Sequence, residues 1–87
     1  MKAYHEILSE LIVENNLNYK TTFYHFKKYG ILVKRDTISK YAQGKSIPKI
    51  DTAGQMLKSF GYQISEEKLR EALRKSNRFS KRLKIYN

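Results

Sequence analysis

Three of the four glycines in this chain, Gly30, Gly44 and Gly61, each follow a stretch whose apolar side chains have helical spacing. Glycine adopts the left-handed conformation in which many helices end, so each of these residues predicts the end of a helix. The only proline, Pro48, biases Ile47 away from helical geometry and predicts a turn after Gly44. The chain is therefore expected to fold as a series of short helices joined by turns.

The amphipathic stretches predict an all-α domain of five helices. The first four are expected at about residues 2–15, 18–29, 35–43 and 50–60, and the fifth begins after Ser65 and extends into the basic C-terminus. Asn18 and Ser65 have side chains that commonly cap helix N-termini. The apolar run at residues 31–33 is too short and isolated for a sheet, so we expect a buried connector. The aromatic residues at 19–29 fit either stacking on single-stranded bases or packing in the core, and their helical spacing favours the core.

Positive charge is concentrated in two blocks of the sequence. The whole chain has 18 Lys and Arg against eight Asp and Glu, which gives a formal charge of +10. Residues 19–49 hold eight basic residues and one Asp, and residues 74–87 hold six basic residues and no acid. Such blocks predict a polyanionic partner, although charge alone does not distinguish nucleic acid from an anionic membrane.

The sequence lacks the residue patterns of a secreted, membrane-spanning, metal-binding or catalytic protein. It has no cysteine, and three glutamates interrupt its apolar N-terminal stretch, so we expect a cytoplasmic protein without a signal peptide or membrane partner. His5 and His25 lie on different expected helices, without a paired carboxylate, so no metal site or other cofactor is predicted. Because there is no glycine-rich phosphate loop and no nucleophile motif, we expect neither enzyme activity nor a small-molecule substrate.

The expected helix at residues 35–43 is short and mostly polar. Its apolar residues Ile38, Tyr41 and Ala42 are enough to anchor it to the second and fourth helices. The side chains left to face outward are Arg35, Asp36, Ser39, Lys40 and Gln43. Groups of this kind recognise base edges in the major groove, and the following turn offers phosphates Lys45, the Ser46 hydroxyl and free backbone N–H groups. The same composition also fits an ordinary solvated helix face.

The segment RDTISKYAQGKSIPKIDTAGQMLKSFGYQIS resembles the second half of a lambda Cro/repressor-type helix-turn-helix domain, of the xenobiotic-response-element-like family. Residues 37–41 (TISKY) are similar to the recognition helix of that family, residues 44–48 (GKSIP) to the turn after it, and residues 60–64 (FGYQI) to its closing segment. Two features depart from the family pattern. The connector GILVKR is longer than usual, with Lys34 where a Ser or Thr cap would stand, and Gly54 lies inside the fourth helix.

The resemblance implies a set of DNA contacts on the second and third helices and on the turn that follows. Base edges would be read by Arg35, Asp36, Ser39 and Lys40. Phosphates would be bound by Tyr19, Lys20, Lys34, Thr37, Gln43, Lys45 and Ser46. Arg35 would be the natural reader of guanine, and Asp36 would accept a hydrogen bond from cytosine or brace Arg35.

The expected organisation places a DNA-binding domain at residues 1–64 and a basic C-terminal helix and tail at residues 65–87. The tail fits a basic arm on flanking phosphates, a membrane-surface segment or a helix that pairs two subunits, and its thin apolar face disfavours the membrane interpretation. We expect a helix that packs on the domain, keeps its basic face near DNA and helps to form a homodimer. The residues assigned to the dimer contact are Leu69, Leu73, Phe79 and Leu83.

The predicted function is that of a Cro-like transcriptional regulator, which binds a specific sequence in double-stranded DNA. Such a protein, from a phage or other mobile element, would be nucleoid-associated and would act by occupying its operator. The alternative is a protein-interaction module, such as an antitoxin or an inhibitor that binds an acidic protein. The basic block at residues 19–49 favours the first hypothesis, because the alternative would confine the charge to the tail.

Overall fold

The computed structural model describes the backbone of residues 1–86 and the side chains of residues 1–82. In this part of the chain there are five α-helices and no strands, which confirms the predicted all-α class. The helices are α1 (Tyr4–Glu14), α2 (Tyr19–Lys28), α3 (Arg35–Ala42), α4 (Ile50–Ser59) and α5 (Glu66–Tyr86). Their positions agree closely with the ranges expected from the sequence.

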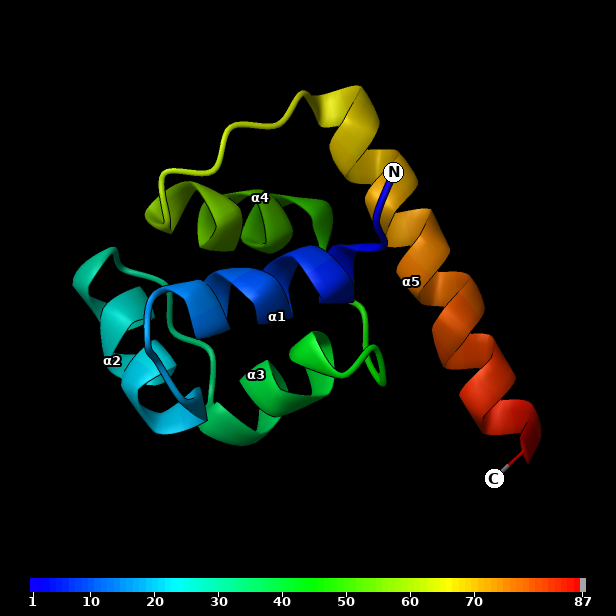
Figure 1. The fold of residues 1–87 in the computed structure, drawn as a ribbon, viewed down its shortest axis with the longest axis horizontal. Helices are drawn as coiled ribbons and strands as arrows, with labels where there is room; N and C mark the ends of the chain where they lie inside the picture. Colours follow the sequence, from blue (N-terminus) through cyan, green and yellow to red (C-terminus); the bar gives the residue numbers. More distant parts are fainter. Residues whose placement is uncertain (87) are drawn as a thin grey trace.

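Helix α1 lies at the centre of the domain (Figure 1). In that view α4 lies on one side of α1, α3 lies on the other, and α2 lies near the C-terminal end of α1. Helix α5 runs past the N-terminal end of α1 and packs against both α1 and α4. Helix α3 packs mainly on α1 and α2, whereas the sequence predicted that it would be anchored to α2 and α4. The outer side of α3 is thereby left uncovered.

Side-chain caps and left-handed glycines explain where several helices begin and end. The Asn18 carboxamide oxygen accepts the N–H of Thr21 at 2.9 Å, and the Thr21 hydroxyl accepts the N–H of Asn18 at 2.8 Å. At the start of α5 the Ser65 hydroxyl accepts the N–H of Lys68 at 3.2 Å. The glycines with φ of 74° to 75° are Gly30, Gly44 and Gly61. Both predicted caps and all three predicted helix ends are confirmed.

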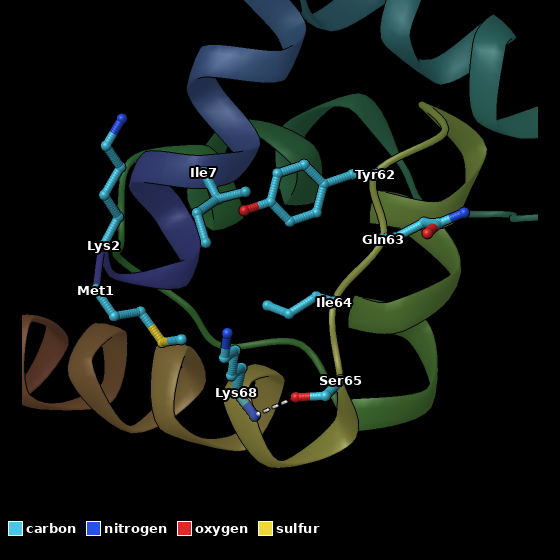
Figure 2. A pocket seen from close by; sticks show the side chains of 8 residues that line it. All are labelled: Met1, Lys2, Ile7, Tyr62, Gln63, Ile64, Ser65 and Lys68. Carbon is cyan, nitrogen blue, oxygen red and sulfur yellow. Dashed lines mark hydrogen bonds between the residues drawn. The ribbon is translucent and has the colours of Figure 1, made fainter.

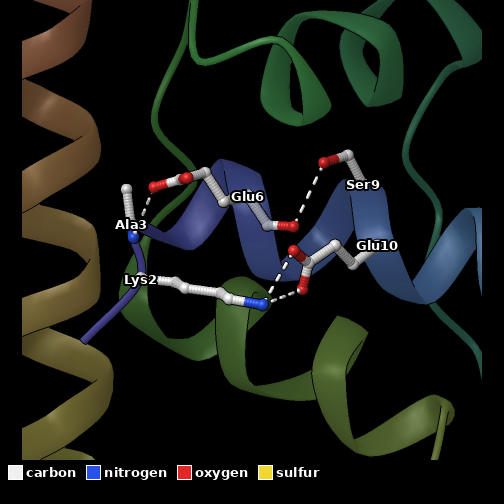
Figure 3. Close-up of polar contacts among 5 residues, drawn as sticks. All are labelled: Lys2, Ala3, Glu6, Ser9 and Glu10. Atoms are coloured by element: carbon white, nitrogen blue, oxygen red, sulfur yellow. Dashed lines mark hydrogen bonds and ion pairs between the residues drawn. The ribbon is translucent and has the colours of Figure 1, made fainter.

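The first turn of α1 is held by acidic side chains of its own segment (Figure 3). The Glu6 carboxylate accepts the N–H of Ala3 at 3.0 Å, which satisfies a free donor at the helix start. The Lys2 ammonium donates to both carboxylate oxygens of Glu10, at 2.7 and 2.8 Å. These two glutamates are therefore engaged near the N-terminus and do not pair with the basic residues of α2 and α3.

Side chains from all five helices form one hydrophobic core. The largest fully buried apolar side chains are Tyr4, Leu8, Phe26, Ile38, Met56 and Leu57. The Tyr4 hydroxyl donates to the Ala53 carbonyl at 2.9 Å and so links α1 to α4. Burial raises the pKa of Tyr4, which keeps the phenol protonated as the donor of this bond. Leu69 and Ala72 belong to the same cluster, so α5 is an integral part of the core.

Three apolar residues that were predicted to be buried are exposed. Tyr24 is 52% exposed, Tyr29 61% and Leu32 78%. Tyr24 lies on the side of α2 opposite Phe26, because the two residues are separated by roughly half a turn of the helix. In the connector before α3 only Ile31 is fully buried, so the prediction of a buried connector was wrong for Leu32. The outer surface of α2 therefore carries an exposed aromatic ring, that of Tyr24.

Candidate nucleic-acid interface

Helix α3 is held by its apolar side and presents its polar side to solvent. Ile38 and Ala42 are buried, and Tyr41 is half-buried. The residues of the polar side are Arg35, Asp36, Ser39, Lys40 and Gln43; Ser39 is half-buried and the other four are exposed. They span about 140° of the helix circumference, because successive residues are about 100° apart. All four predicted base-reading residues therefore share one accessible face.

Two of the outward residues on α3 are joined by a hydrogen bond. The Gln43 amide nitrogen donates to the Ser39 hydroxyl at 2.7 Å. This bond uses one donor of Gln43 and leaves its amide oxygen as an acceptor. Ser39 and Gln43, which were assigned to a base and to a phosphate, therefore act as one polar unit at the middle of the α3 face.

The turn after α3 exposes a lysine side chain, but two of its backbone N–H groups are directed to a carbonyl of α3. Lys45 is exposed, and its N–H donates to the Lys40 carbonyl at 2.9 Å. The N–H of Ser46 is directed to the same carbonyl at 3.4 Å. The prediction of free backbone N–H groups was therefore wrong for these two residues. What the turn offers a phosphate is the Lys45 ammonium and the hydroxyl of the half-buried Ser46.

Helix α5 is attached to this turn by two side chains. The Ser80 hydroxyl donates to the Lys45 carbonyl at 3.1 Å. The Phe79 ring lies over Gly44 and stacks on the His5 ring, with centroids 4.6 Å apart. The basic residues Lys81 and Arg82 directly follow this attachment and are exposed. The second basic block, residues 74–87, is thus attached to the Lys45 turn partway along its length.

The start of α3 lies close to α2, where three predicted DNA-contacting residues meet. Lys20 from α2, Lys34 from the connector and Arg35 from α3 line the same groove. Tyr19 is half-buried and packs against the core, which limits the part of its ring that a phosphate could reach. Thr37 is also half-buried. Lys34 stands at the N-cap of α3 without a side-chain capping bond, as expected for a lysine at this position.

The basic block of residues 19–49 is not neutralised by neighbouring acids. Among the residues whose side chains are described, ion pairs join Lys2 to Glu10 at 2.7 Å and Arg70 to Glu66 at 3.1 Å. Neither pair includes a cation from α2, α3 or the turn after α3. The positive charge of these elements is therefore available to a partner.

The predicted dimer contact is only partly available. Leu69 is 6% exposed and belongs to the core of its own chain, so its assignment to a subunit contact was wrong. Leu73 is half-buried against the same core, and Phe79 is 38% exposed. The side chain of Leu83 lies outside the described residues. The outward apolar surface of α5 within the described side chains is therefore small.

The two histidines lie apart from the α3 face and contact serine hydroxyls. His5 and His25 are both partly exposed, as predicted, and each contacts a serine hydroxyl: Ser76 at 2.8 Å and Ser59 at 3.2 Å. Within the described part of the chain, no group of three His, Asp or Glu side chains is arranged to hold a metal ion. No described helix combines the length and apolar character needed to span a bilayer.

A cavity of about 460 Å³ lies between the start of α1 and the connector before α5 (Figure 2). Ile7 and Ile64 point into it from opposite sides, and Lys2 and Lys68 lie at its edge. The Ser65 hydroxyl in its lining is used to cap α5. None of the predicted DNA-contacting residues lines this cavity, so it is separate from the α3 face.

Comparison with known proteins found no match: no family model, no curated protein and no solved structure is significantly similar to the chain.

Proposed function

We propose that this chain is a sequence-specific double-stranded DNA-binding regulator in which α3 enters the major groove. The observation that carries the proposal is the α3 face, on which Arg35, Asp36 and Lys40 are exposed while Ile38 anchors the helix. The major groove admits a helix and presents a distinct pattern of donors and acceptors for each base pair. An arginine and a lysine can donate hydrogen bonds to guanine, and an acid can accept one from cytosine.

The residues around α3 supply the phosphate contacts of the proposal. Lys20 and Lys34 lie at the N-terminal end of α3, and Lys45 lies just beyond its C-terminal end. Cations at both ends of a helix would bind the phosphate backbone on either side of the groove and hold the helix in register. Tyr19, Thr37, Gln43 and Ser46 complete the proposed phosphate set; Gln43 is exposed and the other three are half-buried.

The proposed regulator acts as a homodimer on an operator of a phage or other mobile element and blocks access by occupancy. One helix of eight residues covers only a few base pairs, which is too little to choose a site in a genome. A two-fold dimer would read two half-sites about 10–10.5 base pairs apart. Because Leu69 is buried, Leu73 and Phe79 are the described residues that remain from the predicted contact.

Selection of duplex DNA from a random pool tests the proposal directly. We expect one enriched palindromic sequence. Arg35→Ala and Lys40→Ala should each weaken binding to that sequence about 5- to 150-fold and relax the preference at particular positions. Lys45→Ala should instead weaken binding to all sequences by a similar factor, because a phosphate contact carries no sequence information.

The matched control is Lys58→Ala, which removes one exposed positive charge from α4, across α1 from α3. This variant should bind the selected duplex nearly as well as the wild type. A pool without any enriched sequence would contradict the proposed function. A change of base preference in Lys45→Ala, but not in Arg35→Ala, would show that α3 has been placed wrongly.

A further inference from the structure

A groove of about 350 Å³ between α2 and the start of α3 combines aromatic and basic side chains. Phe23 and Tyr24 come from α2, together with Lys20. Lys34 and Arg35 come from the connector and from the first turn of α3. The groove therefore joins two elements of the proposed interface, but its aromatic part has no role in reading a duplex.

The aromatic part of the groove includes a ring that is open to solvent. Tyr24 is 52% exposed, and its ring meets Phe23 edge to face, with centroids 5.4 Å apart at 72°. Phe23 is half-buried and packs against the core, so it holds Tyr24 in place from behind. Tyr24 stands four residues from both Lys20 and Lys28, and side chains at this spacing lie on the same face of a helix. An aromatic ring between two lysines is thus displayed on the outer surface of α2.

The charge of the groove is entirely positive. Its three cations are Lys20, Lys34 and Arg35, and no acidic residue lines it. None of the three forms an ion pair with a described side chain. A ligand that complements this surface has a flat apolar face and a negative charge close to it.

We infer that this groove binds one unpaired nucleotide of single-stranded DNA. The base would stack on the exposed aromatic surface of Tyr24 and Phe23, and the adjoining phosphate would lie against Lys20, Lys34 and Arg35. In a duplex the base faces are covered by their neighbours, whereas a single strand presents them to aromatic side chains. Stacking does not depend on the identity of the base, so this site tolerates any sequence.

This inference goes beyond duplex recognition and does not require it. Lys20, Lys34 and Arg35 belong to both surfaces, so a duplex on α3 and a nucleotide in the groove use the same cations. The two ligands therefore compete, and an excess of the selected duplex displaces the single strand. If this chain selects no duplex, the groove is still expected to bind a single-stranded nucleotide, because its aromatic and basic side chains are the same.

Binding of a fluorescently labelled oligothymidine of about 12 nucleotides to the full chain tests the inference. Oligothymidine does not pair with itself, so its bases are free to stack. Tyr24→Leu keeps an apolar side chain but removes the ring, and it should weaken binding about 5- to 150-fold. Tyr24→Phe is the matched control, because it keeps the ring, and it should bind within about two-fold of the wild type.

The outcomes separate the groove from duplex recognition. Equal affinities of Tyr24→Leu and the wild type for oligothymidine would overturn the inference, as would an equal loss in Tyr24→Leu and Tyr24→Phe. A loss in Tyr24→Leu that is the same for oligothymidine and for duplex DNA would also overturn it, because Tyr24 would then touch the duplex backbone. A chain that selects no duplex but binds oligothymidine through Tyr24 contradicts the proposed function and supports the groove.

Discussion

Gly44 is a residue at which three separate parts of the chain meet. Its φ of +75° is one that side chains rarely adopt, and a Cβ added there would lie 2.6 and 2.9 Å from two Phe79 ring carbons. The same Cβ would lie 3.0 Å from the His5 ring. Gly30 has the same φ, but nothing lies within 4 Å of its added Cβ. The two glycines thus share a backbone requirement and differ in the space around them.

Alanine substitution at these two positions should separate backbone strain from crowding. Gly30→Ala should lower the free energy of unfolding by about 1–2 kcal/mol, the cost of a left-handed alanine. Gly44→Ala should lower the free energy of unfolding by about 1–3 kcal/mol more than Gly30→Ala does, because the Phe79 ring must move to make room for the added methyl group. Chemical denaturation of both variants measures the difference. Equal losses in the two variants would contradict the packing of Phe79 on the turn after α3.

The residues of the candidate site could be predicted where one helix face carries the signal. On α3 the apolar residues Ile38, Tyr41 and Ala42 define the inner side, so the outward residues follow from periodicity alone. On α2 aromatic residues occur around much of the helix, so aromatic content could not identify the buried side. The available signal was the placement of Tyr24 among Lys20, Lys27 and Lys28. Lysines rarely share a buried face, and this pattern indicates an exposed ring.

At the scale of elements, the junction between α1 and α5 is made by polar side chains. The backbone N–H of His5 donates to the Ser76 hydroxyl oxygen at 2.9 Å. The ring nitrogen Nδ1 of His5 lies 2.8 Å from the same oxygen. Since the Ser76 oxygen already accepts one proton, its own proton is free for Nδ1 of a neutral imidazole. Burial lowers the pKa of His5, although the neighbouring Glu6 carboxylate opposes this shift. The junction therefore favours the neutral ring.

This junction should make the stability of the fold depend on pH. Because the pKa of His5 is lower in the folded chain than its ordinary value of about 6.5, the unfolded chain binds more protons near that pH. The contribution of His5 to the free energy of unfolding is therefore fully present above about pH 6.5. It is lost as the pH falls towards the lower pKa that His5 has in the folded chain. Unfolding free energies at about pH 7.5 and about pH 5.5 should differ more in the wild type than in His5→Gln. An identical difference in both proteins would contradict this role of His5.

Sequence periodicity predicted the start and the apolar stripe of α5 but not how its later turns would be held. Ser65 followed the recognised pattern of a helix cap, whereas Leu69, which was assigned to a subunit contact, joins Ala72 in the buried core. Ser76 and Ser80 continue the same stripe and are buried, at 1% and 5% exposure. Small polar residues carry no periodic hydrophobic signal, and their partners, His5 and the Lys45 carbonyl, are far away in sequence. Such contacts become visible only when the distant segments are brought together.

For the whole molecule, the arrangement of charge is the property with the widest consequence. The formal charge is +10, and the basic blocks of α2–α3 and α5 are joined through the attachment of Ser80 to the Lys45 turn. A duplex bound on α3 would therefore meet further cations beyond the end of that helix. The number of phosphates neutralised would then exceed those reached by α3 and its turn alone.

Duplex binding should consequently depend strongly on salt. If about six to ten phosphates are neutralised, affinity should fall about 10³- to 10⁵-fold between about 50 and 200 mM salt. Lys81→Ala combined with Arg82→Ala should make the slope shallower by about two units, because each lost contact removes about one counterion. Titrations at several salt concentrations provide this slope. A wild-type affinity that does not change with salt would contradict the electrostatic basis of the proposed function.

The contacts of α1 join it to segments that are far away in the sequence. Tyr4 bonds to Ala53, 49 residues later, and His5 bonds to Ser76, 71 residues later. Contacts between distant positions require large loops to close before they give any stability, and they slow folding relative to helical proteins with local contacts. Because Gly44 packs between His5 and Phe79, the turn after α3 gains these two contacts only when segments from both ends of the chain come together.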